Sequence, residues 1–230
     1  MELLACLLAW LRNNDFMIEN IEIVYLYGGR SDRKFSDNQV NYLRDVILLL
    51  LESLAEKYNV NFIFHCPHSL LLRPNLLSSM IPELFSIIIK RIDRNAIFIG
   101  GDENADHHLH NFMTLVKEDA FFIKNRDASG NIKIRMSKEN IYILKELPES
   151  TFVIFDDLCD GGATFIEGAK YLKSMGINNE LILCVYHGLF SKGFEELSKY
   201  FSHIICTNSY QELNEGLVVG KCKIHQIKVI

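Results

Sequence analysis

The stretch from Thr151 to Leu172, TFVIFDDLCDGGATFIEGAKYL, decides the fold. Its first five residues are apolar and β-favouring, which is typical of a strand buried on both faces of a parallel sheet. Two acids and a glycine-rich turn follow, and apolar residues then recur at helical spacing from Phe165 to Leu172. The order is therefore strand, loop, helix. In α/β proteins such a loop lies at the carboxyl edge of the sheet, where ligands bind.

The loop has the composition of a phosphate-binding turn. Gly161 and Gly162 permit positive φ, and the helix that we expect to begin near Thr164 adds backbone N–H groups and the positive end of its dipole. Asp156 and Asp157 are predicted to leave the strand just before the turn, where paired carboxylates suit the two hydroxyls of a ribose or a bridging Mg2+. The alternative is a capped helix after a glycine turn, with both acids in solvent.

The rest of the chain alternates helical and strand patterns, which predicts an α/β fold with a parallel sheet. Polar residues from Arg91 to Asn95 indicate a boundary between two units, 1–93 and 94–230. Helices are expected over 2–13, 38–57, 80–91, 107–116, 165–172 and 193–199, and strands over 21–27, 60–64, 96–99, 120–124, 151–155, 181–186 and 204–207.

Length and composition limit the class of protein. The chain has 230 residues, 49% hydrophobic and 23% charged, as in a globular protein with a sizeable core. A net charge of −5 argues against nucleic acid as the main partner. The apolar start, MELLACLLAWLR, is too short to span a bilayer, so no membrane partner is expected. Six cysteines without a CxxC pair, most of them in apolar runs, predict buried free thiols at most of these positions and a reducing cytoplasm.

Cations follow two of the predicted strands. The segment 28–34, GGRSDRK, carries three cations within five residues, which suits an anionic ligand such as a nucleotide phosphate. The segment 121–136, FFIKNRDASGNIKIRM, has the outline of a β-hairpin, in which Lys124 and Arg126 alternate by two and share a face. In both places, a solvated charged surface is the alternative interpretation.

Together these features resemble the ribose-phosphate diphosphokinases, which have the type I phosphoribosyltransferase fold. DDLCDGGATF resembles the family's phosphoribosyl diphosphate motif, and the Lys-x-Arg at 124–126 matches the start of a mobile hairpin that closes over the reacting phosphates. HGLFS at 187–191 and ICTNS at 205–209 are similar to further family sequences, and the matches cover nearly the whole chain. The resemblance implies two phosphoribosyltransferase-like parallel-sheet units, the first one truncated. The family's opening strands do not precede MELLACLLAWLR in this sequence, so either the chain is a shortened relative or its start is incomplete.

The resemblance also implies a function. The expected reaction transfers the diphosphoryl group of ATP to the 1-hydroxyl of ribose 5-phosphate, in nucleotide biosynthesis, with Mg2+ as cofactor and homo-oligomers as the assembly. By position, it implies catalytic Lys124 and Arg126; ATP-binding Arg30, Asp32 and Arg33; Mg2+-binding His68 and Asp102; and ribose 5-phosphate-binding Asp156, Asp157, Asp160, Gly161, Gly162, Ala163 and Thr164.

Two places depart from the family pattern. The family's Asp-x-His, which supplies Mg2+ ligands, has Cys66 in place of the Asp, and a thiol is a poor ligand for a hard cation. The family's Pro-Asp-Ala-Gly turn retains only Asp102. Two alternatives therefore remain open: a catalytically silent homologue that binds ribose phosphate or an active subunit, and a phosphoribosyltransferase that consumes phosphoribosyl diphosphate.

Overall fold

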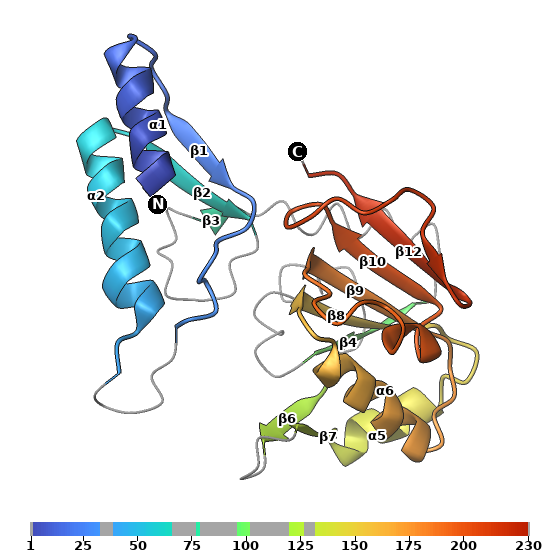
Figure 1. The fold of residues 1–230 in the computed structure, drawn as a ribbon. Coiled ribbons are helices and arrows are strands. Elements are labelled where there is room, and N and C mark those ends of the chain that lie inside the picture. The colour runs from blue at the N-terminus through green and yellow to red at the C-terminus, as the bar shows by residue number, and fades with distance from the viewer. Residues whose placement is uncertain are drawn as a thin grey trace. The chain divides into compact units, whose positions relative to one another are not determined.

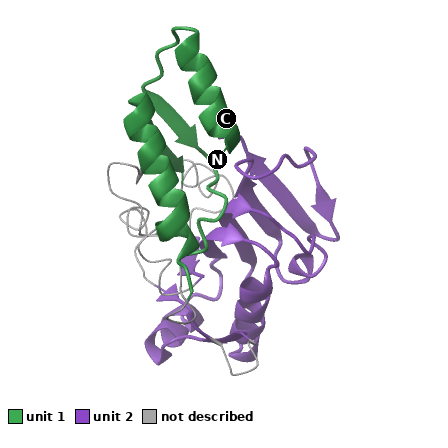
Figure 2. Ribbon diagram, turned by 60° about the vertical axis from the view of Figure 1, so that its left-hand side comes forward, with its two compact units in different colours: residues 1–80 green, residues 81–230 purple. Residues whose placement is uncertain are grey.

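The computed structural model describes residues 2–32, 39–65, 77–78, 96–101, 120–126 and 132–229, with the backbone alone at 77, 78 and 126. The chain forms two compact units, unit 1 (Met1–Met80) and unit 2 (Ile81–Ile230), which are drawn in different colours in Figure 2. The predicted boundary after residue 93 and the predicted helices over 80–91 and 107–116 lie outside the described residues.

Unit 1 is a parallel sheet with helices packed against it (Figure 1). The sheet order is β1-β2-β3, and both neighbouring pairs are parallel. Its core is formed by buried residues of the helices and of β2, with Leu43, Leu51 and Phe62 fully enclosed. The elements are α1 (Glu2–Asn13), β1 (Asn20–Ile23), the π-helical turn η1 (Leu43–Leu48), α2 (Leu49–Tyr58), β2 (Asn61–His65) and β3 (Leu77–Ser78).

Two predicted elements of unit 1 are shorter than expected. The strand predicted over 21–27 ends at Ile23, because the chain then turns and the Gly29 N–H donates to the Leu26 carbonyl at 3.0 Å. The helix predicted from 38 begins at Leu43, where its N–H donates to the Ser31 carbonyl at 3.0 Å. The helix over 2–13 is confirmed.

Unit 2 is built on a seven-stranded sheet in the order β11-β12-β10-β9-β8-β4-β5. Every neighbouring pair is parallel except β11 with β12. The predicted α/β class with a mostly parallel sheet is therefore confirmed. The strands are β4 (Ile97–Gly100), β5 (Ala120–Phe121), β8 (Phe152–Cys159), β9 (Leu181–Gly188), β10 (His203–Thr207), β11 (Val218–Val219) and β12 (Cys222–Ile227).

The hairpin β6 (Ile123–Arg126) and β7 (Ile132–Arg135) is antiparallel, as predicted. Helix α6 (Ala163–Ser174) packs its apolar residues into the sheet's core cluster. The sequence reading missed α5 (Lys138–Lys145), whose N-cap Ser137 accepts a hydrogen bond from the Asn140 N–H at 3.0 Å, and it missed β11 and β12. The helix predicted over 193–199 is wrong: only a 3-10 turn, η3 (Leu197–Lys199), forms after Gly193 adopts a φ of +71°.

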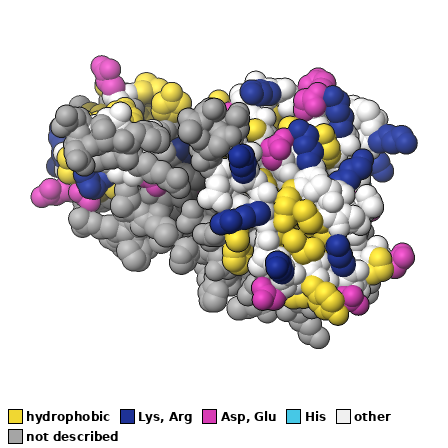
Figure 3. Space-filling view, turned by 90° about the horizontal axis from the view of Figure 1, so that it is seen from below, with side chains coloured by type: hydrophobic (Ala, Val, Ile, Leu, Met, Phe, Trp, Pro, Cys, Tyr) yellow, Lys and Arg dark blue, Asp and Glu magenta, His cyan; other side chains and the backbone are white. Residues whose placement is uncertain are grey.

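The surface and the cysteines agree with a globular protein. Figure 3 shows Lys and Arg side chains mingled with acidic and apolar ones over the described part of one face. In the described stretches, none of the helices combines the length and apolar character that a membrane crossing needs. Cys159, Cys184, Cys206 and Cys222 are buried free thiols, as predicted, whereas Cys6 is exposed. Burial raises the pKa of Cys206 to about 12.

Candidate functional site

Strand β8 carries the two acids to the edge of the sheet. It runs to Cys159, with Asp156 paired to Val185 and Leu158 paired to His187 of β9. The prediction that both acids leave the strand is therefore wrong, because β9 supplies ladder partners beyond Phe155. Successive strand residues project to opposite faces, so the two carboxylates point apart. Asp157 is only 4% exposed, whereas Asp156 is partly exposed.

The Asp156 carboxylate is held against the turn that follows β4. The Gly101 N–H donates to the Phe155 carbonyl at 2.8 Å, and a Cβ on Gly101 would overlap the Asp156 carboxylate. The Asp157 N–H donates to Oδ1 of Asp156 at 2.9 Å. The missing side chain of Gly101 therefore gives the carboxylate its space, and a backbone N–H fixes its orientation.

The loop after β8 delivers the start of α6 to the same edge. Gly162 has a φ of +75°, and the Ile166 N–H donates to its carbonyl at 3.0 Å. The N–H groups of 163–165 precede this bond, so they have no acceptor within the helix. With the helix dipole, they favour an anion at this position. The predicted glycine turn before a helix is thus present, with Thr164 in the helix's first turn.

A second turn, residues 187–191, braces this loop. The Leu189 N–H donates to the Cys159 carbonyl at 2.9 Å, and the Ser191 N–H donates to the Asp160 carbonyl at 3.1 Å. The Ser191 hydroxyl also donates to Oδ1 of Asp160 at 2.5 Å. From the sequence, HGLFS served only to identify the family. In the structure, Ser191 of this segment holds Asp160 in position by these hydrogen bonds.

A buried polar network lies behind the bracing turn. His187 Nδ1 and the Ser209 hydroxyl are 2.8 Å apart, and the Thr207 hydroxyl donates to the Tyr186 carbonyl at 2.7 Å. The Gln211 amide donates to the carbonyls of residues 188 and 189 at 3.1 and 3.0 Å. Thr207 and Ser209 of ICTNS, together with a glutamine that sequence reasoning missed, therefore fix the end of β9.

Comparisons with known proteins identify the fold and the relatives. No family model matches the chain. A ribose-phosphate pyrophosphokinase of Mycoplasmopsis pulmonis is 26% identical over 133 residues, which is 47% of this chain and 41% of the relative. One from Prochlorococcus marinus is 30% identical over 95 residues, 40% of this chain and 27% of the relative. Both similarities support the ribose-phosphate pyrophosphokinase family that the motifs resemble.

The matches span less than half the length of these ribose-phosphate pyrophosphokinases. A solved structure gives wider coverage at lower identity: a phosphoribosylpyrophosphate synthetase from Mycobacterium smegmatis matches with a TM-score of 0.70. That match covers 96% of this chain and 72% of the other, at 14% identity. It establishes the shared fold, in agreement with the resemblance drawn from the motifs.

The family's Lys-x-Arg falls on the hairpin in unit 2. Lys124 pairs with Ile134 across the two strands and is partly exposed. Arg126 pairs with Ile132, and only its backbone is described. Lys124 and Arg126 therefore lie two positions apart on β6.

The family's ATP-side residues fall on unit 1 or outside the described residues. Arg30 is exposed, and the Asp32 carbonyl accepts from the Asn41 side-chain amide at 2.5 Å, which ties the loop to the segment before η1. Arg33, His68 and Asp102 lie outside the described residues.

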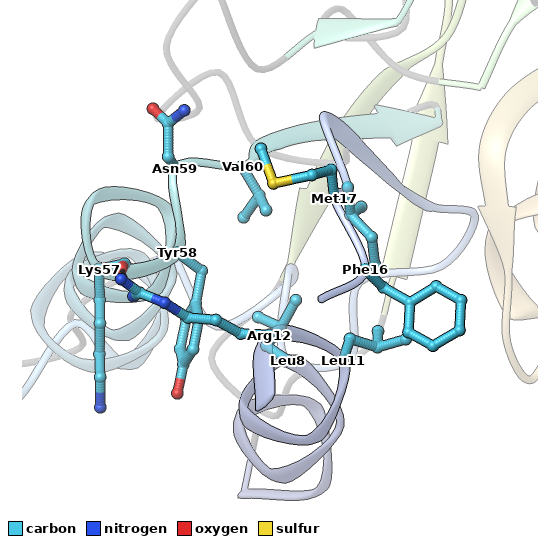
Figure 4. Close-up of a pocket in the computed structure, with 10 residues that line it drawn as sticks. Leu8, Leu11, Arg12, Phe16, Met17, Lys57, Tyr58, Asn59 and Val60 are labelled. Carbon is cyan, nitrogen blue, oxygen red and sulfur yellow. Dashed lines mark hydrogen bonds between the residues drawn. The ribbon is translucent and has the colours of Figure 1, made fainter. Parts of the chain in front are cut away.

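Unit 1 also contains a cavity of about 200 Å³, at the end of its sheet where β1 and β2 begin (Figure 4). Sequence reasoning did not predict it. Its wall is mostly apolar, and the Arg12 guanidinium donates to the Lys57 carbonyl at 2.8 Å beside it. It is lined by Leu8, Leu11, Arg12, Phe16, Met17, Ile18, Lys57, Tyr58, Asn59 and Val60.

Proposed function

We propose that the chain transfers the diphosphoryl group of ATP to the 1-hydroxyl of ribose 5-phosphate and releases phosphoribosyl diphosphate and AMP. The observation that carries this proposal is the connection from β8 to α6: a glycine turn at a φ of +75° opens a helix beside the partly exposed Asp156 carboxylate. The names of the two relatives support the same reaction.

The sugar phosphate binds along this connection. The backbone N–H groups of 163–165 and the Thr164 hydroxyl hold the 5-phosphate at the helix N-terminus. The Asp156 carboxylate, oriented by the Asp157 N–H at 2.9 Å, accepts hydrogen bonds from the ribose hydroxyls. Because Asp157 is buried and projects to the opposite face, we assign it to positioning Asp156 rather than to the sugar.

The transfer itself depends on positioning and electrostatics. The 1-hydroxyl oxygen attacks the β-phosphorus in line, the bond from that phosphorus to the α-phosphate oxygen breaks, and AMP leaves with the electron pair, while the hydroxyl proton is released to water. Lys124 and Arg126 supply positive charge to the transferring group, and Arg30, Asp32 and Arg33 seat ATP.

Mg2+ fits the chemistry of the site without a dedicated cage. Across the described residues, no cluster of three or more His, Cys, Asp or Glu side chains forms a metal site. Mg2+ usually keeps several waters and takes one or two carboxylates plus substrate phosphates. Asp156 is a suitable oxygen ligand, with Asp102 and His68 as the ligands that the family resemblance implies. When bound, the ion would neutralise charge on the phosphates.

A second candidate is a homologue that binds ribose 5-phosphate without turning it over, alone or beside an active subunit. The observation in its favour is Cys66, which replaces an expected carboxylate ligand of Mg2+.

Phosphorus NMR of the purified chain with Mg2+, ATP and ribose 5-phosphate tests the proposal. We expect AMP and a sugar-linked diphosphate, formed roughly 10- to 100-fold more slowly by Asp156→Asn, because hydrogen bonds to a charged group are worth about 1.5–3 kcal/mol. Glu167→Gln, on the exposed part of α6, is the matched control and should react at the wild-type rate. Saturable binding of ribose 5-phosphate without product would favour the silent homologue. Absence of both binding and product would overturn the assignment of the loop.

A further inference from the structure

The proposed phosphate loop lacks a cation of its own. Asp156, Asp157 and Asp160 lie within five residues, and none of the residues from 146 to 169 is Lys or Arg. A phosphate monoester carries a charge of about −1.5 to −2 at pH 7, whereas a helix N-terminus offers about half a positive charge. A cation from another segment would therefore strengthen phosphate binding considerably.

The segment after the bracing turn brings such a cation to the loop. The side-chain stem of Lys192 lies over Gly161: a Cβ on Gly161 would be 3.3 Å from both Cδ and Cε of the lysine. The ammonium nitrogen is one bond beyond Cε, so it reaches the space around the loop. Gly161 thus has a second purpose besides backbone freedom, because its missing side chain lets the lysine stem approach.

Neighbouring hydrogen bonds fix where Lys192 starts. Ser191, the preceding residue, is joined to Asp160 by its N–H at 3.1 Å and by its hydroxyl at 2.5 Å. The lysine is exposed, and among the described residues it forms no ion pair. Its charge is therefore available to a ligand, and binding would not require burying an unpaired ammonium group.

We propose that Lys192 is a phosphate-binding residue of this site, whose ammonium group pairs with the 5-phosphate of the sugar held by the 160–164 loop. The inference rests on the proposed function of that loop and adds a residue to it. The backbone N–H groups give the phosphate its position, and Lys192 supplies the counter-charge that the loop lacks.

Calorimetric titration of the full chain with ribose 5-phosphate, at two salt concentrations, tests the proposal. We expect Lys192→Ala to raise the dissociation constant roughly tenfold at low salt, as for loss of one partly exposed charged contact. Lys192→Arg should retain most of the affinity. Lys170→Ala, which removes a lysine that already pairs with Glu167 on α6, is the matched control and should bind as wild type. Added salt should also weaken ribose 5-phosphate binding by the wild type more than binding by Lys192→Ala, because salt screens the charge that the variant lacks.

The outcomes separate the two proposals. If the wild type binds ribose 5-phosphate and Lys192→Ala binds it equally well, the role of Lys192 is overturned while the loop assignment stands. If the wild type binds neither ribose 5-phosphate nor inorganic phosphate, both are overturned. Circular dichroism of each variant verifies folding, which an exposed lysine should not affect.

Discussion

The two units contain the same kind of parallel sheet but bury it to different extents. In unit 2, β8 and β9 have seven of eight residues buried each, as expected of a sheet covered on both faces. In unit 1, β1 alternates between exposed and partly buried residues, and α1 leaves Leu3, Leu7 and Trp10 at 83%, 50% and 56% exposure. Deep burial therefore accompanies the unit in which the strand ends hold a loop, a carboxylate and a second bracing turn in fixed positions.

The largest effect should come from the core of unit 2. Leu183→Ala, at a fully buried position of β9, should lower the free energy of unfolding by about 2–5 kcal/mol, because it removes packed methyl groups and leaves a cavity. Urea denaturation followed by circular dichroism measures the change.

The matched substitution in unit 1 is Leu7→Ala, at a side chain that is half exposed. It should cost less than about 1 kcal/mol, since little apolar surface is lost from the interior. Trp10 is the chain's one tryptophan and lies in α1, so its fluorescence follows unit 1. Equal losses from Leu7→Ala and Leu183→Ala would contradict the difference in burial.

An effect smaller than that of Leu183→Ala is expected at the loop itself. Gly162→Ala should lower the free energy of unfolding by about 1–2 kcal/mol, because alanine disfavours the left-handed backbone conformation at this position. The loss should be larger still because the added Cβ would lie 3.0 Å from Cδ2 of Leu197. Gly176 has a φ of +81°, and nothing lies within 4 Å of an added Cβ. Gly176→Ala therefore measures the loss of stability from the left-handed backbone alone. Thermal unfolding measures both variants, and only Gly162→Ala should also weaken ribose 5-phosphate binding. A similar loss of binding by Gly176→Ala would argue against a local role of the glycine turn.

The smallest effect concerns pH. His203 Nδ1 and His225 Nε2 lie 2.8 Å apart on β10 and β12. Burial lowers the pKa of both histidines, and the positive charge of Lys223 lowers both further. Glu180 acts in the opposite direction on the pKa of His203, and His203 lowers the pKa of His225. The unfolded chain therefore binds protons more readily than the folded chain. The contribution of the two neutral histidines to the free energy of unfolding is fully present above pH 6.5 and is lost as the pH falls through the folded-state pKa.

Urea denaturation of unit 2 between pH 7.5 and 5 measures this loss. His225→Gln, which removes one titrating group of the pair, should reduce the pH dependence. If the free energy of unfolding of His225→Gln depended on pH as strongly as that of the wild type, groups other than this histidine pair would be responsible.

Strong periodicity made part of the fold predictable. Helix α6, the hairpin and the apolar strands of unit 2 were expected because their residues repeat with the spacing of one structure. The end of β8 was not predictable, because two consecutive aspartates indicate a loop unless it is known that β9 pairs with this part of β8. The bracing turn depends on Ser191 meeting Asp160, 31 positions away, which no local pattern reports.

The same holds for the candidate site. Glycines and acids near a helix start were recognisable from composition, but their geometry was not. That Asp156 and Asp157 face apart, and that the stem of Lys192 covers Gly161, are consequences of strand pairing and tertiary packing. The family resemblance supplied roles for Arg33, His68 and Asp102 that lie outside the described residues.

The strand order of unit 2 has a consequence for how the chain is made. Strands β8, β9, β10 and β12 are close in sequence, whereas β4 joins them by pairing Ile97 with Phe152. During synthesis, β4 leaves the ribosome well before its partner exists, and closing so long a loop slows its docking. Until β8 is synthesised, the edge of β4 that will pair with it stays open, and an apolar strand with an open edge is prone to aggregation.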